Sequence, residues 1–144
     1  MPATTASVHI QAPPADVMAV LIEHERYPEL FPHIQGVAVE QIDADTWDVE
    51  YVTRVIRDLR YTLRLTRDGD SMLSWTQLDG VFLRNEGHWR LSGTDTGTRV
   101  DYLLDIELAV FLPHAIARSL TEHALPRLLA QVKAEVERRA QPAS

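Results

Sequence analysis

The central part of the chain alternates between apolar and polar residues with the period of two that is typical of β-strands covered on one face. Between residues 34 and 110 this alternation is interrupted by turn signals such as Asp68-Gly69-Asp70 and Asp79-Gly80. We therefore expect an antiparallel meander of about six strands. The residues that we place on its covered face are Trp47, Val49, Tyr51, Thr53, Val55, Leu59, Tyr61, Leu63, Leu65, Leu73, Trp75, Gln77, Asn85, Gly87, Trp89, Leu91, Val100, Tyr102, Leu104, Ile106 and Leu108.

The opposite face of the same strands carries mostly charged side chains. Their signs alternate, as in Glu50, Arg64, Glu86, Arg90, Arg99 and Asp101. We interpret this row as a solvated surface with weak cross-strand pairs, not as an active site.

Shorter elements precede the meander. Residues 6–11 predict a strand, which the prolines of APPAD end. A short helix over 17–25 follows, with Asp16 in its first turn, where the helix dipole favours a carboxylate. Residues 27–32, which include two prolines, predict a second brief helical turn.

The longest helical pattern lies near the C-terminal end, over residues 113–139. Pro113 suits the first helical turn, where its missing N–H is no loss. Pro126 predicts a kink, because proline removes one helical hydrogen bond and clashes with the preceding turn. Its apolar stripe moves across that kink from Ile116, Leu120 and Ala124 to Leu125, Leu129, Val132 and Val136.

These elements predict a single α+β domain over residues 1–144. The simplest arrangement that covers the apolar faces is a strongly curved antiparallel sheet of about seven strands wrapped around the long C-terminal helix. A sheet bent around a helix seldom fills its own concavity, so we expect a pocket between the two.

Composition and charge exclude several classes of function. The chain has no cysteine, which excludes disulfides, thiolate nucleophiles and Cys-ligated metal sites. Its formal net charge of −7 disfavours binding to a nucleic-acid backbone. No apolar run approaches the roughly 20 residues of a membrane span, and the first residues lack a signal-peptide pattern. We predict a cytoplasmic protein, with its oligomeric state left open.

The predicted pocket has a mixed lining. A mostly apolar cleft with a few hydrogen-bonding groups orients an apolar ligand that carries carbonyls or hydroxyls. The candidate residues on the sheet are Tyr51, Thr53, Tyr61, Trp75, Gln77, Asn85, Trp89 and Tyr102. On the long helix, Leu120 and His123 lie on one side and are candidates for the mouth of the pocket. Each of these residues also suits an ordinary core or helix-edge position.

Motifs for metal or cofactor chemistry are missing. His24-Glu25 begins like a zinc motif, but Pro28 stands where the second histidine would be required. The sequence has no phosphate-binding or dinucleotide glycine pattern and no G-x-S-x-G nucleophile motif. We predict no metal and no cofactor.

Three segments resemble a known superfamily across nearly the whole chain. These segments are HIQAPPADVMAVLIEHERYPELFP, EGHWRLSG with TRVDYLLDIEL, and FLPHAIARSLTEHALPRLLAQVKAEVERR. They are similar to the START-like (SRPBCC, helix-grip) superfamily, which includes polyketide cyclase/dehydrase and coenzyme Q-binding proteins. The resemblance implies a helix-grip fold.

Three functions remain open at this level. The first is the binding, and possible transport or presentation, of a small hydrophobic ligand such as a quinone, lipid or polyketide-like aromatic. The second is a polyketide aromatase/cyclase for aldol cyclisation and dehydration, for which Tyr51, Tyr61, Asn85 and His123 offer suitable side chains. The third is a protein-interaction role of the ribosome-association kind, which the resemblance permits.

Overall fold

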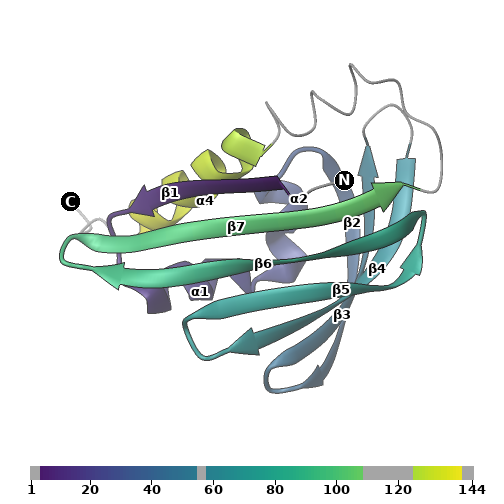
Figure 1. Cartoon of the computed structure of the whole chain (residues 1–144), viewed down its shortest axis with the longest axis horizontal. Helices are drawn as coiled ribbons and strands as arrows, with labels where there is room; N and C mark the ends of the chain where they lie inside the picture. The colour runs from purple at the N-terminus through teal and green to yellow at the C-terminus, as the bar shows by residue number, and fades with distance from the viewer. Residues whose placement is uncertain (1–3, 55–57, 109–124, 141–144) are drawn as a thin grey trace.

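A computed structural model of the chain describes residues 4–54, 58–108 and 125–140. Its elements follow the predicted order of a strand, short helices, six further strands and a C-terminal helix (Figure 1). The elements are β1 (Thr4–Ile10), α1 (Pro14–Leu21), the 3-10 turn η1 (His24–Arg26), α2 (Tyr27–Leu30), β2 (Ile34–Asp43), β3 (Thr46–Arg54), β4 (Asp58–Asp68), β5 (Met72–Gly80), β6 (Phe82–Thr94), β7 (Gly97–Leu108) and α4 (Leu125–Ala140).

All seven strands form one antiparallel sheet in the order β1-β7-β6-β5-β4-β3-β2. The sheet bends strongly, and α1, α2 and α4 all lie on its concave side (Figure 1). The predicted fold class, a curved seven-stranded α+β sheet that holds a C-terminal helix, is therefore confirmed.

The two ends of the sheet differ, and we name each by a glycine. At the Gly69 end the chain turns from β2 to β3, from β4 to β5 and from β6 to β7. At the Gly80 end, β5 turns into β6 and β2 begins. β1 ends at the Gly69 end, since Ile10 pairs with Thr98 of β7.

The alternation along the strands sorts side chains between two environments, as the pattern predicts. On β3, for example, Trp47, Val49, Tyr51 and Thr53 are buried while the residues between them are half-buried. The charged residues of the convex face pair across strands. The Arg64 guanidinium donates two hydrogen bonds, of 2.8 and 3.0 Å, to the Asp48 carboxylate, and Arg84 bridges to Asp105 at 2.8 Å. This arrangement agrees with a solvated, ion-paired surface.

The first helix is shorter than predicted. α1 begins with Pro14 at its first position and ends at Leu21. His24 and Glu25, which we expected on this helix, lie instead in η1. The reason is the turn that follows, where Tyr27 packs inward and its hydroxyl donates a 2.5 Å hydrogen bond to the Leu21 carbonyl oxygen. This bond closes the chain back onto the end of α1.

The C-terminal helix packs its apolar stripe against the sheet and α1. Its buried residues are Leu125, Leu129, Val132 and Val136, as the stripe predicts. The rest of the predicted helix, residues 113–124, lies outside the described part of the chain, so the kink at Pro126 stays a prediction. Two side chains of α4 close the edge of β1. Lys133 donates to the His9 carbonyl oxygen at 3.0 Å, and Glu137 accepts from the Gln11 amide at 2.8 Å.

Candidate functional site

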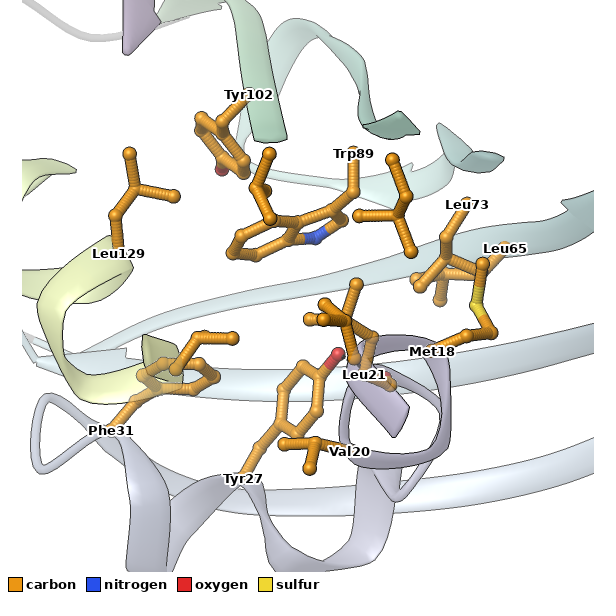
Figure 2. Packing of buried hydrophobic residues seen from close by; sticks show 14 of the residues in the cluster. Met18, Val20, Leu21, Tyr27, Phe31, Leu65, Leu73, Trp89, Tyr102 and Leu129 are labelled. Atoms are coloured by element: carbon orange, nitrogen blue, oxygen red, sulfur yellow. Dashed lines mark hydrogen bonds between the residues drawn. The ribbon is translucent and has the colours of Figure 1, made fainter. Parts of the chain in front are cut away.

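The concave face of the sheet has two chemically different halves. Toward the Gly69 end it is mostly apolar where α1 covers it, and its residues are almost completely shielded from solvent. Figure 2 shows Met18 of α1 directed toward Leu65 and Leu73 of the sheet. This half is a packed core in which the buried Thr98 hydroxyl donates a 2.7 Å hydrogen bond to the Ala12 carbonyl oxygen. The members of this half that are at most 5% exposed include Ile10, Val17, Met18, Leu21, Leu65, Leu73, Leu91 and Val100.

Toward the Gly80 end the same face carries hydrogen-bonding side chains. Five predicted site residues lie here, and strand pairing brings them together from four neighbouring strands. Tyr51 of β3 stands directly opposite Tyr61 of β4, and Tyr61 in turn faces Gly80 of β5. The residues of this half that we predicted as pocket lining are Tyr51, Thr53, Tyr61, Gln77 and Asn85.

Trp75 marks the boundary between the two halves. Its backbone pairs with Gly87 of β6, and a Cβ at position 87 would lie 2.7 Å from Cζ2 of the indole. The missing side chain of Gly87 therefore makes room for the ring. The indole Nε1 of Trp75 donates a buried hydrogen bond of 3.1 Å to Oδ1 of Asn85. This bond fixes both side chains in the lining.

A chain of aromatic rings runs through the Gly80 half. Phe31 packs edge-on against Tyr27 at 5.1 Å, and Tyr27 lies 6.3 Å from Tyr51. Tyr51 and Tyr61 are stacked, with centroids 5.4 Å apart and an angle of 25° between the rings. Tyr61 then meets the edge of Phe82 at 5.1 Å. The ring faces form a continuous apolar wall from α2 to the start of β6.

Tyr102 and Trp89 lie next to this boundary, on the side of the apolar half. Their rings pack edge-on with centroids 4.6 Å apart, and Tyr102 lies 5.5 Å from Trp75. In Figure 2 the Trp89 indole points into the packed core, between the sheet and the side chains of α1 and α2. Trp89 is therefore a core residue at the border of the lining. Tyr102 joins the lining through its ring.

Three of the four tyrosines lie on the concave face of the sheet and Tyr27 belongs to α2, and each of the four is at least partly shielded from solvent. Burial raises the pKa of every one of these phenols, to about 12 for Tyr61 and further for Tyr27, Tyr51 and Tyr102. The pKa of Tyr51 is raised further by its proximity to the other three phenols. At neutral pH these groups are uncharged hydrogen-bond donors.

The phenols differ in how their hydrogen bonds are used. The Tyr27 hydroxyl donates its hydrogen bond to the Leu21 carbonyl oxygen. Tyr61 lies beside the Thr53 hydroxyl, and that hydrogen bond partly offsets the rise in its pKa. Within residues 4–54, 58–108 and 125–140, the hydroxyls of Tyr51 and Tyr102 have no such side-chain or backbone partner. These two phenols are therefore the available donors among the described residues.

Of the two polar atoms in the Gln77 side chain, only the amide nitrogen has a hydrogen-bond partner among the described residues. Its Nε2 donates to the Phe82 carbonyl oxygen at 2.8 Å, whereas its Oε1 is buried without a hydrogen-bond partner in the described structure. Leu120 and His123, the remaining predicted site residues, lie outside the described residues. Five of the eight described candidates thus lie in the Gly80 half, Trp75 and Tyr102 lie at its boundary, and Trp89 pairs with Tyr102 from the core side.

Sequence reasoning missed three aromatic residues of this site and one buried histidine. Tyr27, Phe31 and Phe82 belong to the aromatic wall, although they stand in a proline-rich turn and at a strand start, where alternation gives no facing. His24 is 2% exposed and lies between Tyr27 and Trp47, at centroid distances of 5.4 and 5.0 Å. Both of its ring nitrogens lack a partner among the described residues, and burial lowers its pKa to about 4.

A second depression lies on the outside, between the α1–α2 segment and α4. It is an open groove of about 350 Å³ whose charged side chains neutralise one another. Arg139 bridges to Glu23 at 2.6 Å, and Arg138 to Glu135. This groove is not the pocket that the sequence predicts. The described residues contain no cluster of three or more His, Cys, Asp or Glu that could hold a metal ion.

Comparisons with known proteins agree with this architecture. A family model described as "Polyketide cyclase / dehydrase and lipid transport" matches residues 10–133. No significant match was found among curated proteins. In the described part of the chain, no helix is long and apolar enough to cross a membrane.

Three solved structures share the fold at low sequence identity. The Zhui aromatase/cyclase from a Streptomyces species is 19% identical, with 99% of this chain and 98% of that chain covered and a TM-score of 0.87. A protein from Thermus thermophilus is 20% identical, with 97% and 100% covered and a TM-score of 0.84. A START superfamily protein from Mycobacterium smegmatis is 14% identical, with 95% and 98% covered and a TM-score of 0.81.

Proposed function

Because the chain belongs to the polyketide cyclase/dehydrase and lipid transport family, we propose that it binds a small hydrophobic molecule against the Gly80 half of its concave face. The ligand is an apolar, ring-containing compound with at least one carbonyl or hydroxyl group, in the class of quinones and polyketide-like aromatics. Its site consists of the predicted residues of that half, of Trp75 and Tyr102 at the boundary, and of Tyr27, Phe31 and Phe82.

One observation carries this proposal: the packed rings of Tyr27, Tyr51, Tyr61 and Phe82 lie on the half of the concave face that also carries hydrogen-bonding side chains. Burying a polar group without a partner costs free energy, so a core built only for stability gains nothing from gathering phenols. Ligand oxygens would accept hydrogen bonds from the Tyr51 and Tyr102 hydroxyls. The stacked rings of Tyr51 and Tyr61 offer flat apolar area for a ring of the ligand.

Binding is better supported than catalysis by the described residues. An aldol cyclisation needs a group that exchanges a proton near neutral pH. The raised pKa of each phenol makes it a hydrogen-bond donor and a poor general base. Asn85 does not titrate, and it already accepts from Trp75. An aromatase/cyclase activity like that named for the Streptomyces relative therefore rests on residues such as His123, outside the described part.

The experiment that tests the proposal has two arms. Native mass spectrometry of the purified protein, before and after solvent extraction, should reveal a bound apolar molecule. Titration with menadione (2-methyl-1,4-naphthoquinone) should quench the fluorescence of Trp75 at the edge of the site. The double variant Tyr51→Phe/Tyr102→Phe should raise the Kd about 5- to 150-fold, because two neutral hydrogen bonds are worth about 1–3 kcal/mol together.

Tyr27→Phe is the matched control. It removes the same atom from a phenol whose hydrogen bond is internal. It should lower thermal stability slightly and change the Kd by less than about threefold, since no ligand donor is lost. Finding neither a co-purified molecule nor binding of menadione would overturn the proposal. Equal affinity in the double variant and the wild type would remove the two phenols from it.

A further inference from the structure

The two outer strands of the sheet differ in how the rest of the chain covers them. β1 and β2 are the edge strands, since the strand order begins with one and ends with the other. Along β1, α4 supplies hydrogen-bond partners, because Lys133 donates to the His9 carbonyl oxygen and Glu137 accepts from the Gln11 amide. Along β2, the backbone groups of residues 36–41 have hydrogen-bond partners only in β3 within the described structure. The outer side of β2 is therefore an open edge.

This open edge lacks the usual protection against pairing with another chain. Exposed edge strands are commonly blunted by lysine, proline or bulges. Residues 34–42 contain neither lysine nor proline, and Glu40 is their only charged residue. β2 has bulges at Gln35 and Ile42, where its pairing with β3 skips a residue, but the stretch 36–41 between them keeps a regular register. The middle of β2 is thus a regular strand that could accept a further strand.

The sequence of this strand reads almost the same in both directions. Residues 34–42 are IQGVAVEQI, and seven of the nine positions are unchanged when the order is reversed. Two identical strands related by a two-fold axis pair antiparallel, so that residue i faces residue j and residue j faces residue i. Placing Ala38 on that axis makes nearly every residue face its own kind. The resulting pairs are Ile34–Ile42, Gln35–Gln41, Gly36–Glu40, Val37–Val39 and Ala38–Ala38.

This register also suits the charges and the exposed apolar surface of the strand. Each copy has a formal net charge of −7, so a pairing that placed acidic residues opposite one another would be unfavourable. Here Glu40 faces Gly36, and Asp43 faces His33. Ile42, which is 45% exposed, comes to lie at the start of the second β2. The pairing therefore covers a large apolar side chain without opposing two like charges.

We propose that β2 pairs antiparallel with β2 of a second copy of this chain, with Ala38 on the two-fold axis, so that the two sheets join into one. The proposal is independent of the proposed function, because it uses the outer edge of the sheet and not the concave face. About four to six backbone hydrogen bonds form across such a pair of short strands. A single strand pair is smaller than the interface of roughly 1,000 Å² that stable complexes bury, so the dimer is weak and dissociates on dilution.

Sedimentation velocity tests the dimer, with a charge exchange at the two-fold axis. The wild type should change from monomer to dimer between about 10 μM and 1 mM, as expected for a small interface. Ala38 is exposed, so Ala38→Lys and Ala38→Glu should each keep the fold. Each variant alone should raise the dimer Kd at least about fivefold, because two like charges then stand directly opposite each other.

Mixing the two variants tests the register itself. An equimolar mixture of Ala38→Lys and Ala38→Glu should form more dimer than either variant alone, since the introduced charges then attract. This rescue requires that position 38 of one copy faces position 38 of the other. Thr5→Lys and Thr5→Glu are the matched controls, because Thr5 is also exposed but lies on β1, the covered edge. Both controls should dimerise like the wild type.

Amide hydrogen exchange provides a second measurement on the wild type. Amides of residues 36–41 that point away from β3 should exchange more slowly at high protein concentration than at low concentration, because pairing protects them. A wild type that stays monomeric at about 1 mM would overturn the proposal and leave the edge to a different partner. Unchanged dimerisation of Ala38→Lys, no gain in the mixture, or an equal loss in Thr5→Lys would also overturn it.

Discussion

Replacing His24 by phenylalanine should change how the stability of the fold depends on pH. His24 is 2% exposed and has no partner for either ring nitrogen among the described residues. Burial lowers its pKa to about 4, whereas an unfolded histidine titrates near 6.5. The unfolded state therefore binds a proton at pH values where the folded state does not. Stability is lost as pH falls through 6.5, and the loss continues down to about 4.

The magnitude follows from these two pKa values. Between pH 7.5 and pH 5 the unfolded histidine becomes almost fully protonated, while the folded one stays mostly neutral. The linkage relation then gives a loss of about 2 kcal/mol from this residue alone. Most carboxylates remain ionised over the same interval, so their contribution is small. His33 and His88, whose pKa values are also lowered by burial, add a loss of the same sign.

Urea denaturation at the two pH values measures this effect. The wild type should lose about 2 kcal/mol more than His24→Phe between pH 7.5 and pH 5, because the variant keeps every other titrating group. A phenyl ring also suits a place between Tyr27 and Trp47. Equal losses in the two proteins would refute the reasoning, and would mean that His24 gains a hydrogen-bond partner or water in the folded state.

Two further predictions concern the boundary of the two halves. Gly87→Ala should lower the free energy of unfolding by at least about 1–3 kcal/mol, because the new Cβ clashes with the Leu103 carbonyl and the Trp75 ring. Gly36→Ala, whose Cβ would have nothing within 4 Å, should be nearly neutral. Equal effects of the two substitutions in thermal or urea unfolding would contradict the packing. Asn85→Leu should cost about 1–3 kcal/mol, since the buried indole N–H of Trp75 loses its acceptor. Combining it with Trp75→Phe should recover part of that cost in a double-mutant cycle, and strict additivity would argue against the bond.

The sequence predicts the sheet and the facing of its strands well. The alternation of apolar and polar residues from Trp47 to Thr53 predicts correctly which side chains are buried. It does so because a sheet that is buried on one face requires an apolar residue at every second position. The apolar stripe from Leu125 to Val136 likewise predicts the buried side of α4 correctly. For the same reason, pairing of correctly assigned strands brings most of the predicted lining together.

Features that depend on contacts between elements could not be predicted. The register skips at Leu78 and Leu83 leave no trace in the alternation, because a bulge is defined by the partner strand. The early end of α1 depends on where Tyr27 packs, and the burial of His24 follows from it. A proline-rich turn indicates a change of direction, but it does not indicate which of its side chains points inward.

The concave face is one continuous buried cluster, so its two halves are not independent in energy. Tyr51 is 4% exposed and belongs to the same core as the residues beneath α1, and buried aromatic rings contribute strongly to stability. On the proposed function, the side chains that would contact a ligand therefore also hold the sheet and the helices together. A substitution that changed the ligand would then lower stability as well, and a new specificity would require compensating changes elsewhere in the core.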